Sequence, residues 1–148
     1  MTTNTLPEIR STSISKLIIT GAIAGLGGGL VFGMLMGMMG MLPMVGMLIG
    51  SDSAISGFIV HMGISAGLGA LFGLSAARFL TGWGSAILTG LGYGVIWWVL
   101  GALIMMPLML GMSEMVFTIG TDQWMSLMGH MIYGVVTAVV FVPLSKRI

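Results

Sequence analysis

The chain has no cysteine and very few charged residues. Only 6% of its 148 residues are charged, five of them Lys or Arg and four Asp or Glu. The absence of cysteine excludes disulfides, zinc-thiolate sites and thiol nucleophiles. A soluble domain has roughly 25% charged residues, so this chain cannot cover a water-exposed surface. Its net charge of +1 and its lack of a basic patch give no reason to expect a nucleic-acid partner.

Long apolar runs dominate the chain instead. Hydrophobic residues make up 57% of it, and about 20 consecutive apolar residues span the hydrocarbon core of a membrane. We expect the first run to end or kink near Pro43 and the third near Pro107, because proline has no amide hydrogen. The sequence predicts an all-α polytopic membrane protein, with a polar cytoplasmic tail at 1–15 and one four-helix domain at 16–148. The predicted membrane helices lie at about 17–42, 54–78, 84–112 and 122–144.

The few charges segregate along this predicted topology. Arg78 and the basic residues near both termini fall on one side of the membrane, whereas Asp52, Glu114 and Asp122 fall in loops on the other. Lys and Arg favour the cytoplasmic side. We therefore expect both termini in the cytoplasm and the chain in the inner membrane of a prokaryotic cell. Asp52 and Asp122 each precede a predicted helix, so we expect them to cap it.

The two halves of the chain resemble each other. The segment GLGGGLVFG from Gly25 matches GLGYGVIWW from Gly90, and His61-Met62 matches His130-Met131. Each half, at about 17–80 and 83–145, would then be one helical hairpin. Because both halves start on the cytoplasmic side, the pattern predicts parallel repeats related by a pseudo-two-fold axis along the membrane normal. Chance similarity between two apolar low-complexity strings is the alternative.

Small residues recur at every fourth position in the predicted helices. A four-residue step returns to nearly the same helix face, and in lipid small residues let two backbones approach closely. These seams predict helix packing within the bundle, in a homo-oligomer, or against a larger membrane complex. The predicted packing residues are Gly21, Gly25, Gly29, Gly33, Gly37, Gly57, Ser65, Gly69, Gly73, Gly90, Gly94, Ser126, Gly134 and Ala138.

Two histidines, His61 and His130, lie within these small-residue seams. Ionisable residues inside a membrane are functional hypotheses by default. In one interpretation, each neutral imidazole bonds a backbone carbonyl or a serine hydroxyl, with Ser65 and Ser126 one turn away. In a second, the pair binds a haem or chlorin through axial ligation, or a metal. In a third, the histidines line a path for protons or substrate, although no intramembrane Asp, Glu, Lys or Arg supports it.

Methionine is unusually frequent. All of the 17 methionines except Met1 fall in or beyond the outer half of the predicted membrane spans. Thioethers are soft ligands that suit Cu(I), so His61, His130, Met62 and Met131 form a candidate copper site. The alternative is that methionine serves as a flexible filler between glycine-rich helices.

The segments VIWWVLGALIMMPLMLGM at 95–112 and WMSLMGHMIYG at 124–134 carry a family resemblance. They resemble a group of uncharacterised bacterial and archaeal membrane proteins with four helices, duplicated hairpins and a histidine in the second and fourth helices. The resemblance covers most of the chain beyond residue 20. It implies the duplicated architecture and no particular activity.

The predicted loops leave little mass outside the membrane to hold a catalytic site. We therefore expect a protein that is not an enzyme, embedded among membrane lipids as an accessory or assembly subunit that packs against other membrane helices. One alternative is a haem-, chlorin- or Cu(I)-binding protein that uses His61 and His130. Another is a small channel or transporter.

Overall fold

The computed structural model describes residues 13–147, so most of the predicted polar tail lies outside the described residues. Within this range the chain is helical and contains no strand. The prediction of an all-α polytopic membrane protein is confirmed. Four helical segments are long and apolar enough to cross a membrane: Ile14–Met38, Ala54–Ser75, Trp83–Met109 and Thr121–Ser145.

Short helical pieces join or extend these four spans. The third span is composite, because an α-helix continues as a π-helix and then as a last α-helical turn. The elements in chain order are α1 (Ile14–Met38), α2 (Leu42–Gly46), η1 (Met47–Ile49), α3 (Ala54–Ser75), η2 (Ala77–Phe79), α4 (Trp83–Trp97), the π-helix η3 (Trp98–Met105), α5 (Met106–Met109), η4 (Ser113–Met115) and α6 (Thr121–Ser145).

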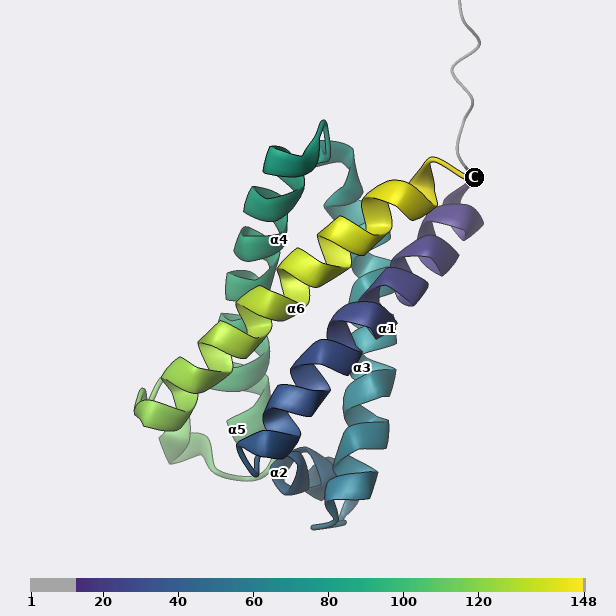
Figure 1. Cartoon of the computed structure of the whole chain (residues 1–148). Coiled ribbons are helices and arrows are strands. Elements are labelled where there is room, and N and C mark those ends of the chain that lie inside the picture. The colour runs from purple at the N-terminus through teal and green to yellow at the C-terminus, as the bar shows by residue number, and fades with distance from the viewer. Residues whose placement is uncertain (1–12, 148) are drawn as a thin grey trace, which may run out of the picture.

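The spans pack as two helix pairs joined at the centre. Helix α1 packs along α3, and α4 packs along α6. Helices α1 and α6 also pack on each other, so they connect the two pairs (Figure 1). The start of α1 and the end of α6 lie at the same end of the bundle, whereas α2 and α5 lie at the opposite end (Figure 1).

Glycines bring the backbones of α1 and α3 into direct contact. A Cβ added at Gly25 would overlap the carbonyl oxygen of Ser65 and lie 2.6 Å from the Cα of Gly69. Gly21 lies against Gly69 and Gly73 in the same way. Because there is little hydrophobic gain between helices in lipid, close backbone contact is what stabilises such a pair.

The pair α4 and α6 is built by the same device. A Cβ added at Gly90 would lie 2.7 Å from the Cα of Val135, and one added at Gly94 would lie 2.7 Å from the Cα of Met131. In return, a Cβ at Gly134 would overlap the carbonyl oxygen of Gly90. Each pair therefore depends on the absence of side chains on both helices.

The structure places nearly all of the predicted packing residues inside the bundle. All of them are buried except Gly37, which is exposed, and Ser126, which is partly buried. The prediction for Gly37 fails because α1 ends one residue later, so that a Cβ there would touch only the Cδ1 atom of Leu42, at 3.5 Å. Gly57 packs on α2, where its missing Cβ makes room for the carbonyl of Leu42.

A second face of α1 packs on α6 through residues that the seam pattern did not identify. The ring of Phe32 lies where Gly129 would carry its Cβ. One turn earlier, Gly28 makes room for the side chains of Tyr133 and Thr137. These contacts set a glycine against side chains of the facing helix, whereas Gly21 and Gly25 in one pair and Gly90 and Gly94 in the other meet backbone atoms.

Helix α1 ends earlier than the predicted end near Pro43. Gly40 has a φ of 69°, and its amide donates to the carbonyl of Gly37 while the amide of Met41 donates to that of Met36. This is the Schellman arrangement, in which a residue in the left-handed region ends a helix and glycine is the preferred residue there. Pro43 instead occupies the first turn of α2, where it needs no amide hydrogen.

The third span changes its winding before Pro107. Proline has no amide hydrogen, so the carbonyl of Leu103 has no α-helical donor four residues later. The amide of Phe117 donates to this carbonyl at 3.2 Å. The segment after α5 therefore folds back onto the π-helix η3, and it does so with Phe117 at a φ of 57°, unusual for a bulky residue.

The predicted aspartate caps are wrong. Helix α3 begins after Ser53, whose hydroxyl accepts from the amide of Ile55 at 3.2 Å. Helix α6 begins after Gly120, whose amide donates to the side-chain oxygen of Gln123 at 2.9 Å. Serine is as good a cap as aspartate, and a neighbouring serine one residue nearer the helix takes the role from Asp52.

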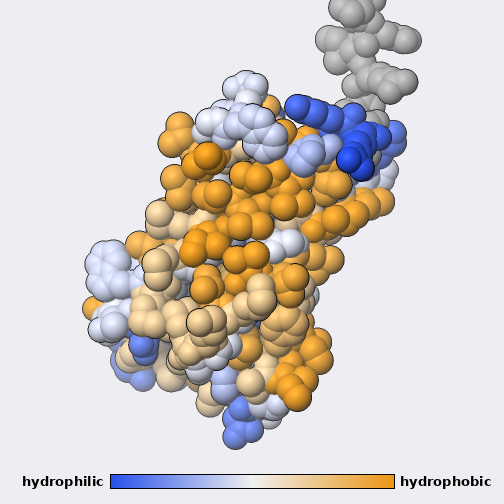
Figure 2. All heavy atoms as spheres, in the orientation of Figure 1, coloured by the Kyte–Doolittle hydropathy of each residue, from blue (hydrophilic) through white to orange (hydrophobic). Residues whose placement is uncertain are grey.

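The surface matches an environment of lipid. Hydrophobic residues cover most of the visible face between the two ends of the bundle, and the strongly hydrophilic residues gather near those ends (Figure 2). Many large apolar side chains on the spans are exposed, among them Ile19, Leu30, Ile59, Leu88 and Ile96. In water such a surface would be an aggregation site, whereas lipid covers it.

The glycine contacts give a direct prediction. We expect Gly69→Ala to lower the stability of the bundle by about 1–3 kcal/mol, because the new Cβ would meet the backbone of Gly21 and Gly25. Gly63→Ala on the same helix has open space, and alanine favours a helix by about 1 kcal/mol over glycine. Thermal unfolding of both variants in detergent measures the difference. Equal loss from both would contradict the described packing of α3.

Candidate functional site

His61 lies on α3 and faces α1. Its side chain is only 6% exposed, and its Nε2 atom is 2.9 Å from the carbonyl oxygen of Gly29. A carbonyl can only accept, so Nε2 carries the hydrogen and donates it, which leaves Nδ1 with a lone pair. The hydroxyl of Ser65 is 3.5 Å from the same nitrogen. The imidazole therefore makes a hydrogen bond across the tightly packed α1–α3 interface.

His130 lies on α6 and bonds within its own helix. Its Nδ1 atom is 2.8 Å from the carbonyl oxygen of Ser126 and 3.3 Å from the hydroxyl of the same residue. By the same reasoning Nδ1 is the donor and Nε2 holds the lone pair. The two histidines thus use opposite ring nitrogens, and only His61 links two helices by its hydrogen bond.

Phe32 of α1 brings the two histidines into one cluster. Its ring centroid is 5.3 Å from that of His61 and 4.9 Å from that of His130, with interplanar angles of 86° and 63°. These edge-to-face contacts are favourable for aromatic rings. The phenyl ring contacts both imidazoles and is itself seated against Gly129. A macrocycle held by both histidines would have to displace it.

The two methionines of the predicted copper site lie at different interfaces. The sulfur of Met62 approaches α1, 3.5 Å from where Gly29 would carry a Cβ. Met131 lines an apolar groove of about 240 Å³ together with Leu91 of α4 and Met128. Within residues 13–147, no group of three or more His, Asp or Glu side chains is placed to hold a metal ion. The structure therefore brings His61 and His130 to a common ring without gathering Met62 and Met131 around them.

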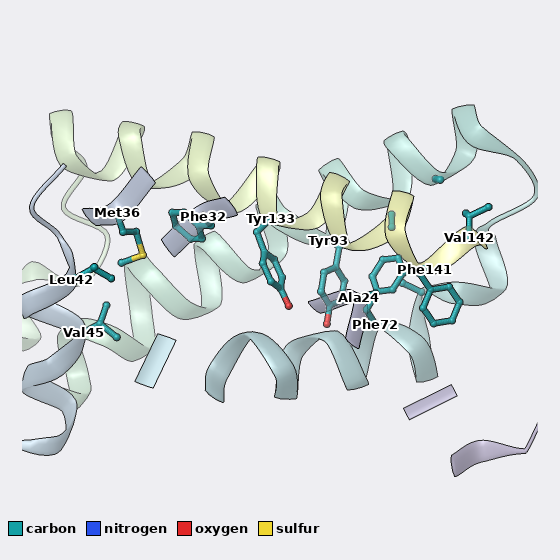
Figure 3. Packing of buried hydrophobic residues seen from close by; sticks show 13 residues of the cluster. Ala24, Phe32, Met36, Leu42, Val45, Phe72, Tyr93, Tyr133, Phe141 and Val142 are labelled. Atoms are coloured by element: carbon teal, nitrogen blue, oxygen red, sulfur yellow. The ribbon is translucent and has the colours of Figure 1, made fainter. Parts of the chain in front are cut away.

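Two tyrosines extend the polar core beyond the histidines. The hydroxyl of Tyr133 on α6 donates to the carbonyl of Ser65 at 2.8 Å. That of Tyr93 on α4 donates to the carbonyl of Leu68 at 2.6 Å. Both acceptors are on α3, and the two phenols point in the same direction (Figure 3). The available sequence signal was a tyrosine within an apolar run, since a buried hydroxyl needs an acceptor.

Two polar atoms near these tyrosines have no hydrogen-bond partner among the described residues. They are the hydroxyl of Thr137, whose residue is completely buried, and the Nε1 atom of Trp97. The Trp97 ring lies 6.1 Å from that of Tyr93. Trp98, its neighbour in the chain, does have a partner: its Nε1 donates to the carbonyl of Gln123 at 2.9 Å. The core is thus polar at several points, and not all of them are paired.

Comparison with protein-family models, curated proteins and solved structures found no match for this chain. The resemblance to duplicated four-helix membrane proteins, based on residues 95–112 and 124–134, therefore stays an expectation.

The tyrosines and the threonine allow a matched test of the polar core. We expect Tyr133→Phe to destabilise the bundle by about 0.6 kcal/mol and at most about 1.7 kcal/mol, as is typical of a hydrogen bond between membrane helices. Thr137→Val keeps the shape and removes an unpartnered buried hydroxyl, so it should leave stability unchanged or raise it. Thermal unfolding in detergent distinguishes the two. A larger loss from Thr137→Val than from Tyr133→Phe would mean that the threonine hydroxyl has a partner.

The position of Phe32 gives a prediction about haem. We expect haem added to the purified protein to give no spectrum of ligation by two histidines, because the phenyl ring contacts both imidazoles and occupies space that the macrocycle would need. An absorption spectrum in mild detergent is the measurement. A Soret band of that type that disappears in His61→Ala and in His130→Ala would contradict it.

Proposed function

We propose that this chain is a non-catalytic subunit of a prokaryotic inner membrane, where it packs against other membrane helices in a homo-oligomer or a larger complex. The observation that carries the proposal is a set of outward-facing glycines on the finished bundle. Gly63 and Gly67 on α3, and Gly84 and Gly92 on α4, are exposed and have open space where a Cβ would be.

These glycines differ from the seam residues, which the bundle uses for itself. Gly69 and Gly134 already contact a neighbouring backbone, so they are not available to a partner. Outward glycines expose backbone and weaken a helix by about 1 kcal/mol each relative to alanine. In lipid their benefit is the close approach of another helix. The pair Gly63 and Gly67 is spaced by four residues, as such an approach requires.

Little of the described chain lies outside the four spans, and this supports a role without catalysis. Between the spans, the described chain has only short connections, built from α2, η1, η2, η4 and a few turn residues. Loops are where catalytic residues usually lie. The basic side chains of Lys16, Arg78 and the segment 146–147 share one end of the bundle. By the positive-inside rule we infer that this end is the cytoplasmic one.

The alternatives have weaker support. A haem or chlorin held by His61 and His130 conflicts with the ring of Phe32, which contacts both imidazoles. A channel or transporter would use the polar core, but the donor nitrogen of each histidine and both tyrosine hydroxyls are already bonded to backbone carbonyls. Groups engaged in this way are not free to relay a solute.

Photo-crosslinking tests the proposed packing face. We expect a photoreactive amino acid at Leu71, on the same face of α3 as Gly67, to form adducts with protein in native membranes. Ile23 of α1 is the matched control, because it is exposed and lies two residues from Gly21, which contacts Gly69. It should label mainly lipid.

The mass of the adduct identifies the partner. A mass of two copies indicates a homo-oligomer, and any other defined mass indicates a complex with a second protein. If Leu71 and Ile23 give no protein adduct, or give the same adducts in the same yield, the outward glycines do not mark a packing face and the proposal fails.

A further inference from the structure

Four methionines converge at the end of the bundle opposite the start of α1 and the end of α6. Met44, Met106, Met112 and Met115 line one pocket of about 70 Å³, together with Thr118 and Gln123. The four come from separate parts of the chain: α2, the start of α5, the turn after α5, and η4. Within the chain they are up to 71 positions apart (115 − 44). Their spacing in the sequence therefore does not predict that they meet, and the tertiary fold brings them together.

Two backbone features build this pocket. Pro107 leaves the carbonyl of Leu103 without its helical donor, and the amide of Phe117 takes that place, which folds residues 110–118 back over η3. Gly111, with a φ of 73°, ends α5 so that the amide of Met112 donates to the carbonyl of Pro107 at 2.8 Å. These bonds position Met112 and Met115 opposite Met44.

A filler role does not account for this arrangement. Methionine used as a filler takes up irregular gaps between helices, whereas here four methionine side chains surround a space that stays open. Met44 and Met115 are 47% and 38% exposed, so the pocket can be reached from outside the bundle. The volume exceeds the roughly 10–15 Å³ that a cavity needs to hold one water, so the pocket has room for a single ion.

The charge around the pocket favours a cation. Glu114 lies between Met112 and Met115 in the chain, and Asp122 precedes Gln123. Asp52 is at the same end of the bundle, in the connection before α3, whereas the described Lys and Arg residues are at the opposite end. A concentration of one sign of charge raises the local concentration of the opposite ion. Among cations, the neutral thioethers of methionine prefer soft metal ions, and Cu(I) is the soft monovalent cation of biology.

We propose that the pocket lined by Met44, Met106, Met112 and Met115 binds Cu(I) through methionine sulfurs at the outer face of the membrane. The ion enters and leaves as Cu(I), so no oxidation, reduction or proton transfer is involved. This site is separate from His61 and His130, which lie deeper and use their donor nitrogens for backbone carbonyls. It goes beyond the proposed packing function and does not rest on it.

Anaerobic titration of the full-length protein in detergent with Cu(I), in competition with a chromogenic Cu(I) chelator, tests the site. We expect about one equivalent to bind, and the triple variant Met44→Leu, Met112→Leu, Met115→Leu to weaken binding by about tenfold or more, because it removes soft ligands. Leucine keeps volume and apolarity, so folding should be preserved, and unfolding curves verify this. Met106 stays in place because it packs against the hydrophobic core.

Two control variants make the result specific. The first is the triple variant Met34→Leu, Met38→Leu, Met128→Leu, in which the three replaced methionines are at least half exposed and lie outside this pocket. This variant should bind Cu(I) as the wild type does. The double variant His61→Ala, His130→Ala should also bind normally. No binding by the wild type, equal weakening in the control triple, or loss in the histidine variant would each overturn the proposal.

A measurement on the wild type alone covers the case in which the pocket triple does not fold. Ag(I) is a soft ion of the same charge without redox chemistry under these conditions. We expect it to protect Met112 and Met115 from a methionine-selective oxidant, as read by mass spectrometry of peptides. Met34 should be oxidised at the same rate with and without the metal. Oxidation of Met112 and Met115 at the same rates with and without Ag(I) would overturn the proposal.

Discussion

The structure depends on the direct contact of helix backbones at glycine. Lipid is as apolar as leucine, so burying leucine between membrane helices gains little, and dispersion between closely packed atoms has to stabilise the pairs. Gly25 on Gly69, and Gly90 on Gly134, provide that contact. The same closeness places carbonyl oxygens within reach of buried donors on the facing helix, as with His61 and Gly29. The close approach of the helix backbones therefore accounts both for the packing of the helix pairs and for the hydrogen bonds of buried donors in this bundle.

The parts of the fold that follow from local patterns could be predicted. Hydropathy locates the four spans, and a four-residue repeat of small residues identifies the faces on which α1 packs on α3 and α4 on α6. The interface between the pairs could not be predicted in the same way. Its residues are a large side chain on one helix and a glycine on another, as with Phe32 and Gly129. Nothing within either segment indicates that the two will meet.

The candidate sites show the same division. The seam pattern correctly suggested that His61 would face another helix, but it contained no sign that a phenyl ring would lie beside both imidazoles. Methionine frequency suggested a copper site that includes Met62 and Met131, and the structure places these two residues at different interfaces. The methionines that do converge depend on a carbonyl freed by Pro107 and on the loop that bonds it. Such a fold-back is a property of tertiary structure, beyond the reach of spacing rules.

The two kinds of interface also have consequences for the order in which the chain assembles. The bond between His61 and Gly29, within one pair, joins residues 32 apart, whereas that between Tyr133 and Ser65 joins residues 68 apart. Contacts between nearby residues close at a lower cost in chain entropy and form earlier. We expect α1 and α3 to be paired while the second half is still being inserted. The junction between α1 and α6 can form only when the last helix has entered the membrane.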